Sequence, residues 1–136
     1  KPDEWSDLKG LYSYKGRVPE ATKADFQTYK KIKATGIYGT VRVPAAKIDT
    51  SALTLDVAHI NERRHGVTQE EAVSYIKNAA FSLKRRHWTG ETFLNYYSEE
   101  GASYVRTSDN VIRTSFKKDE FDKKTKSAME VLKNGE

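Results

Sequence analysis

The sequence predicts an α+β fold in which helices pack against a small, twisted antiparallel sheet. A capped amphipathic run occupies residues 67–86, three short runs rich in β-branched and aromatic residues follow it, and a second amphipathic run closes the chain. At 136 residues the chain has the length of one domain. We therefore expect a lead-in or linker at residues 1–19 and a single α+β domain at residues 20–136. The polar start "KPDEWSDLKG" resembles a linker, so we expect the chain to be a segment of a longer polypeptide.

The first half of the domain has the weaker patterns. Residues 20–35 place apolar side chains among lysines at near-helical spacing, which predicts a short helix. Residues 36–44 alternate apolar with polar or small residues and end in Pro44, which favours an extended segment. In residues 47–66 the apolar side chains first recur at every second position, and this pattern ends at His59. The segment is therefore compatible with either a strand or a helix.

The clearest helix is predicted over residues 67–86. Thr68 and Glu71 have the spacing of a capping box. The apolar positions that follow share one helical face, and they are Ala72, Val73, Ile76, Ala79, Ala80 and Leu83.

Three short strands are predicted next, at residues 92–98, 102–108 and 111–116. Turn-forming residues separate them, so we expect an antiparallel meander. The chain then closes with a helix over residues 119–135, whose apolar stripe is Phe121, Ala128, Met129 and Leu132 and whose cap is Gly135.

Composition narrows the function classes. The net charge is +5 and the pI is about 9.3, which suits a polyanionic partner but also suits a merely basic surface. The absence of cysteine excludes a disulfide, a thiolate nucleophile and a cysteine-bound zinc. Neither a Walker motif nor G-x-G-x-x-G occurs, which argues against nucleoside triphosphate chemistry. No apolar run approaches the length of a membrane span.

Two histidines and two arginines gather in "HINERRH", residues 59–65. On one helix His59 and His65 would lie about 120° apart, too far round for a close metal pair, so we expect no metal and no cofactor. Cleavage of RNA without a metal needs a base for the 2′-hydroxyl, an acid for the leaving oxygen and cations for the phosphorane. His59, His65, Arg63 and Arg64 can supply these groups. A partly buried structural histidine beside a solvated turn is the alternative.

The tripeptide Arg-Thr-Ser occurs twice, at residues 106–108 and 113–115, on two strands expected to pair. Strand alternation groups the side chains by face: Val105 with Ser103 and Thr107, Tyr104 with Arg106, Arg113 with Ser115, and Ile112 with Thr114 and Phe116. Two arginines with hydroxyls beside them make a phosphate cradle, although solvated arginines on an exposed face are as common. Basic and aromatic residues nearby suit unpaired RNA. We assign substrate binding to Arg63, Lys84, Tyr97, Arg106 and Ser115, and expect Trp88 and one of Tyr96 and Tyr97 in the core.

The ordered combination of "H-I-x-x-R-R-H", "NYYSEEGASYV" and the "IRT" strand resembles the Barnase, EndoU, colicin and RelE superfamily of metal-independent ribonucleases. The resemblance is closest to its phage and polymorphic-toxin members and is strongest over residues 50–122. It implies cleavage of RNA, tRNA or similar, to a 2′,3′-cyclic phosphate and a free 5′-hydroxyl. It also implies that the catalytic set is His59, Arg64 or His65, Arg113 and Thr114.

A domain of this type implies a toxin at the C-terminus of a larger bacterial or phage-derived protein, acting in the bacterial cytoplasm after secretion or delivery. The resemblance further implies a cognate acidic immunity protein. We expect a monomer with no membrane contact.

Two alternatives stay open. A non-catalytic RNA-binding or phage structural module would use the same basic and aromatic residues without cutting. An ADP-ribosyltransferase toxin could use Arg42 with Thr114 and Ser115, although the Glu-x-Glu loop expected late in the chain is missing.

Overall fold

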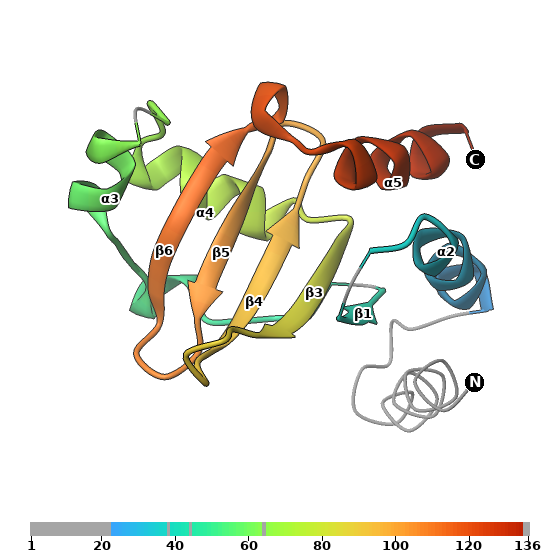
Figure 1. The fold of residues 1–136 in the computed structure, drawn as a ribbon, viewed down its shortest axis with the longest axis horizontal. Helices are drawn as coiled ribbons and strands as arrows, with labels where there is room; N and C mark the ends of the chain where they lie inside the picture. The colour runs from blue at the N-terminus through green and yellow to red at the C-terminus, as the bar shows by residue number, and fades with distance from the viewer. Residues whose placement is uncertain (1–22, 38, 44, 64, 135–136) are drawn as a thin grey trace.

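The computed structural model describes residues 23–37, 39–43, 45–63 and 65–134, and it has the predicted α+β architecture (Figure 1). The predicted lead-in lies outside the described residues. Helices and strands follow in the order α2 (Lys23–Ala34), β1 (Thr40–Arg42), η2 (Thr50–Ala52), β2 (Thr54–Leu55), α3 (Val57–Glu62), α4 (Gln69–Lys77), β3 (Phe81–Arg86), β4 (Thr92–Tyr97), β5 (Gly101–Arg106), β6 (Val111–Lys117), η3 (Lys118–Glu120) and α5 (Lys123–Asn134). None of the helices in these ranges is long and apolar enough to cross a membrane.

Within the described ranges, six strands form one sheet in the order β1-β3-β4-β5-β6-β2. Strands β3 to β6 form an antiparallel meander, so the predicted meander is confirmed and gains β3 as a further strand. Strand β1 extends the sheet antiparallel to β3, and β2 pairs parallel with β6. Residues 47–66, where strand and helix both stayed open, contain β2 followed by α3.

The helix predicted over residues 67–86 is correct for its first half and wrong for its second. The capping box of Thr68 and Glu71 forms, with both hydrogen bonds at 3.1 Å, but α4 ends at the cap residue Asn78. The Ala80 N–H then donates to the Tyr97 carbonyl at 2.9 Å, and β3 begins. Pairing with β1 and β4 satisfies the backbone of β3 on both sides, so tertiary contacts override the helical spacing of its apolar residues.

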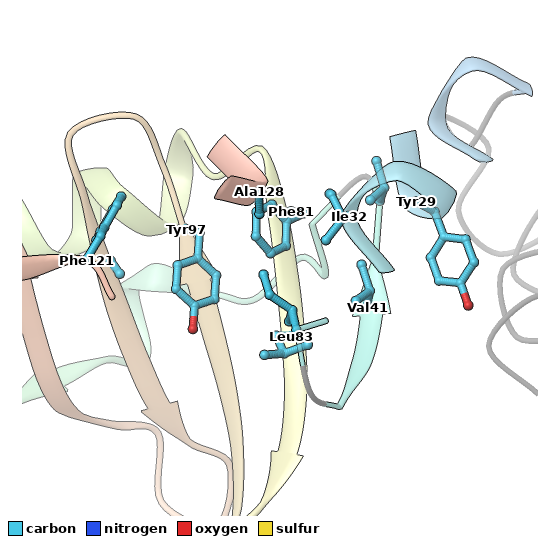
Figure 2. Packing of buried hydrophobic residues seen from close by; sticks show 11 residues of the cluster. Tyr29, Ile32, Val41, Phe81, Leu83, Tyr97, Phe121 and Ala128 are labelled. Atoms are coloured by element: carbon cyan, nitrogen blue, oxygen red, sulfur yellow. The ribbon is translucent and has the colours of Figure 1, made fainter. Parts of the chain in front are cut away.

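The two faces of the sheet are covered by different helices (Figure 1). Helix α4 crosses behind the strands, where its buried Ala72, Tyr75 and Ile76 share a core cluster with residues of β4, β5 and β6. Helices α2 and α5 cover the β1 and β3 side of the other face, and the core there includes Phe81, Leu83, Tyr97 and Phe121 (Figure 2). No described helix crosses the front of β5 and β6 (Figure 1).

A β-bulge in β6 decides which side chains reach that front face. Tyr104 pairs with Thr114, but Val105 pairs with Ile112, so Arg113 is an extra residue in the ladder. Ile112 is therefore buried against α4, whereas Thr114 lies on the front face with Tyr104. The predicted grouping of Ile112 with Thr114, and of Arg113 with Ser115, is wrong because the extra residue inverts the alternation. Thr114 and Phe116 do share a face, as predicted, because they pair with Tyr104 and Ala102. The grouping of Tyr104 with Arg106 and of Val105 with Ser103 agrees with the register.

Candidate active site

A cleft of about 510 Å³ lies on the front face of the sheet. At one end, which we call the α3 end, it is lined by His59, Arg113 and Thr114. At the other, the β3–β4 end, it is lined by Arg85, Arg86, His87, Thr89, Glu91 and Phe93. Tyr104, Asn95 and Arg106 also line it, and Arg106 lies next to Glu91 of the β3–β4 end. Its volume falls in the range of small-molecule sites, so it can hold a nucleotide.

His59 is positioned by the first turn of α3. Asp56 follows β2 and caps this helix, because its Oδ1 accepts a hydrogen bond from the His59 N–H at 3.1 Å. Its Oδ2 lies 3.3 Å from Nη1 of Arg113. One carboxylate thus fixes the helix that carries the histidine and holds the guanidinium beside it.

The pKa of His59 is lowered from its ordinary value of 6.5. Burial is the largest cause, and the positive charge of Arg113 and the neighbouring His65 lower the pKa further, while Asp56 acts in the opposite direction. The ring is therefore neutral at pH 7, which is the form that can accept a proton.

His65 lies beside His59, contrary to the separation expected for one continuous helix. Helix α3 ends at Glu62 and the chain turns, with the His65 N–H bonded to the Ile60 carbonyl at 3.1 Å. The two imidazole centroids are 5.8 Å apart. Nδ1 of His65 lies 3.1 Å from both carboxylate oxygens of Glu120, and His65 is not among the described residues that line the cleft.

The other basic residues of this segment contribute less than expected. Arg63 is the exposed C-cap of α3 and is not among the described residues that line the cleft, although its charge also lowers the pKa of His59. Arg64 lies outside the described residues. Within the described ranges, no group of three histidine, aspartate or glutamate side chains is arranged to hold a metal ion.

The two arginines of the predicted phosphate cradle face the same cleft, but they differ in availability. Arg106 donates to both carboxylate oxygens of Asp109, at 3.0 and 2.9 Å, and lies 3.5 Å from Glu91. Its charge is thus already largely neutralised. Arg113 has its 3.3 Å contact with Asp56 and keeps 40% of its side chain exposed, beside Thr114. Arg113 is therefore the better phosphate ligand of the two.

Besides Arg63, three further expected binding residues do not line the cleft. Ser115 is fully buried on the α4 side, where its hydroxyl donates to the Ala102 carbonyl at 3.0 Å, because the bulge turns it away from the front face. Tyr97 is 3% exposed and packs in the core, so it supports the cleft through the 3.0 Å bond between its hydroxyl and that of Tyr104. Lys84 is exposed but alternates with Arg85 along β3 and projects from the other face.

Several residues that line the cleft were not assigned a role from the sequence, foremost His87. It follows β3 in the turn to β4, and its Nδ1 lies 3.0 Å from the hydroxyl of Thr89. That hydroxyl donates to Glu91 at 2.9 Å. Asn95 was missed because it sits mid-strand among aromatics, yet its buried Oδ1 has no hydrogen-bond partner among the described residues.

Trp88 was expected in the core, and it is 89% exposed. It stands at the tip of the β3–β4 turn, where no second layer covers it in the described part of the chain. The turn-forming residues in "HWTGE" were the one sign in the sequence that Trp88 lies in an exposed turn. Both Tyr96 and Tyr97 are buried instead.

Comparisons with family models, with curated proteins and with solved structures find no match for this chain. The resemblance to the ribonuclease superfamily thus stays a prediction, and any function has to be argued from the cleft itself.

Proposed function

We propose that the protein is a metal-independent endoribonuclease whose active site is the α3 end of the cleft. The observation that carries the proposal is the placement of His59, kept neutral by burial and by Arg113, beside an exposed guanidinium in an open, basic cleft. A neutral imidazole next to a phosphate ligand is the arrangement that attack by a ribose 2′-hydroxyl requires.

In the proposed reaction His59 removes the proton of the 2′-hydroxyl. The oxygen attacks the adjacent phosphorus, and the bond from phosphorus to the 5′-oxygen breaks. His65 gives that leaving oxygen a proton, and Arg113 and Thr114 contact the non-bridging oxygens. The products are a 2′,3′-cyclic phosphate and a free 5′-hydroxyl, and the starting state is restored when His59 releases its proton to solvent and His65 takes one up.

His65 suits the role of acid for two reasons. Its ring centroid is 5.8 Å from that of His59, so it stands next to the cleft, although His65 is not itself among the described residues that line it. Glu120 holds Nδ1, which directs Nε2 to the substrate and fixes the ring orientation, as carboxylates do for catalytic histidines.

The first experiment incubates the purified protein with single-stranded RNA in EDTA and determines the chemistry of the product ends. We expect cyclic phosphate and 5′-hydroxyl ends, no cleavage of the matching DNA, and a loss of about 10²- to 10⁴-fold in rate for His59→Ala. Lys126→Gln, an exposed change on α5 that does not line the cleft, is the matched control and should keep the parent rate. Intact RNA with the parent protein would refute the proposal.

A second experiment separates acid from base. A substrate with sulfur in place of the leaving 5′-oxygen needs no general acid, because a thiolate leaves unaided. His65→Ala should cleave the ordinary substrate slowly and the sulfur substrate at close to the parent rate, whereas His59→Ala should be slow on both. Equal losses for His65→Ala on the two substrates would remove His65 from the acid role.

We further propose that this activity is that of a toxin domain that acts on tRNA or similar RNA in the bacterial cytoplasm and is blocked by an acidic immunity protein. The resemblance and the net charge of +5 support this setting. Cytoplasmic production of the parent protein, but not of His59→Ala, should arrest bacterial growth.

The transferase alternative gains nothing from the geometry. Arg42 lies on β1 and Thr114 on β6, at opposite sides of the sheet, and Ser115 is buried. The binding-module alternative predicts RNA binding without cleavage, which the first experiment detects.

A further inference from the structure

Next to the β3–β4 end of the cleft, at the tip of the turn, stands an aromatic side chain that does not line the cleft and that the fold leaves in solvent. Trp88 is 89% exposed, and its ring centroid lies 5.4 Å from that of His87. The His87 ring in turn contacts Phe93 on the cleft wall, with a centroid separation of 5.9 Å. The three rings form a continuous aromatic surface that runs from the cleft to the tip of the turn.

The turn holds this surface in place. The His87 N–H donates to the Glu91 carbonyl at 2.7 Å, and the Gly90 N–H donates to the His87 carbonyl at 2.8 Å. Gly90 adopts a φ of 93°, which glycine accommodates without strain. The side-chain contacts of Thr89 with His87 and Glu91 add to these bonds. Trp88 is thus presented on an ordered turn, which lowers the entropy lost on binding.

The positive charges at this end are available to an anion. Arg85 and Arg86 line the cleft, are exposed, and form no salt bridge with a carboxylate in the described ranges. Arg106, by contrast, is neutralised by Asp109 and Glu91.

We propose that the β3–β4 end of the cleft is a subsite for an unpaired nucleotide of single-stranded RNA, with the base stacked on Trp88 and the flanking phosphates held by Arg85 and Arg86. Stacking on an exposed aromatic beside free guanidiniums is the general way in which proteins hold unpaired nucleotides. The subsite lies beyond the reacting groups at the α3 end, so it positions the strand without taking part in bond cleavage. It deepens the proposed function, because it names the form of RNA that the same cleft takes.

The test measures binding separately from cleavage. A short, fluorescently labelled 2′-O-methyl oligoribonucleotide lacks the attacking hydroxyl, so its affinity can be followed by anisotropy with the parent protein. Trp88→Ala should weaken binding by about 10- to 100-fold, and Trp88→Phe should restore most of the affinity. Arg85→Gln should reduce the slope of log K against log salt concentration by about 0.7, and the control Lys126→Gln should leave it unchanged. Far-ultraviolet circular dichroism checks that each variant is folded.

The outcomes separate this inference from the proposed activity. If the parent protein cleaves RNA but Trp88→Ala binds the oligonucleotide as tightly as the parent does, the subsite is refuted and the nuclease stands. If binding depends on Trp88 but no RNA is cleaved, the subsite stands and the nuclease proposal fails. If the parent protein does not bind the oligonucleotide, the subsite is refuted whatever the activity.

Discussion

Asp56 is expected to support the candidate site in two separable ways, and two substitutions distinguish them. Its Oδ1 caps α3 through the His59 N–H, and its Oδ2 faces Arg113 at 3.3 Å. Asp56→Ala removes both interactions. Asp56→Asn keeps a side-chain oxygen for the cap and removes the charge, since asparagine caps helices about as well as aspartate.

The structure sets the magnitudes. Loss of an N-cap costs about 1 kcal/mol. The ion pair contributes about 0.2–1 kcal/mol, because the Arg113 and Asp56 side chains are 40% and 30% exposed and water screens them. Asp56→Ala should therefore lower the free energy of unfolding by about 1–2 kcal/mol and Asp56→Asn by under about 1 kcal/mol. For 136 residues, 1 kcal/mol corresponds to about 3–4 °C in Tm.

Urea and thermal denaturation measure the stability difference, and NMR titration of the imidazole gives a second readout. The Asp56 charge raises the pKa of His59, so both variants should show a lower His59 pKa than the parent protein. Equal destabilisation by the two variants would refute the capping role. An unchanged His59 titration would refute the electrostatic one.

Three further predictions concern two buried positions, Gly101 and Ser115, and the titration of His59. Gly101→Ala places a Cβ 2.5 Å from the Tyr75 ring and 2.6 Å from the Phe116 carbonyl oxygen, so we expect a loss of about 1–3 kcal/mol by urea denaturation. An unchanged midpoint would mean that both the ring and the neighbouring backbone shift without cost. Ser115→Ala removes a buried hydroxyl that also lies 2.9 Å from that of Ser103, so stability should fall by about 1–2 kcal/mol while the RNA cleavage rate stays at the parent value. Because the pKa of His59 is lowered, the unfolded chain binds more protons than the folded chain just below pH 6.5, so the free energy of unfolding should decline as pH falls from 6.5 and His59→Gln should flatten that part of the curve.

The sequence carried enough local information for the fold class but not for the strand at residues 81–86. The capping box and the turn residues act over three or four positions, and α4 and the meander form where those residues predict them. Residues 81–86 also fit a helical face, because Leu83 continues the spacing of Ile76 and Ala80. Long-range pairing with β1 and β4 decided in favour of the strand, and no local pattern reports such pairing.

The candidate site depended on a single inserted residue that strand alternation does not anticipate. With regular alternation Thr114 would face α4 and Ser115 the cleft. The bulge at Arg113 exchanges those positions, so Thr114 joins Arg113 at the cleft while Ser115 is buried. His65 came to lie beside His59 for a comparable reason, since the helix that was assumed to separate them ends first. Residue types alone were enough to predict what kind of chemistry the site performs. Which residues form the site depends on the β-bulge in β6 and on the end of α3, because these bring the arginine, the hydroxyl and the two imidazoles next to one another.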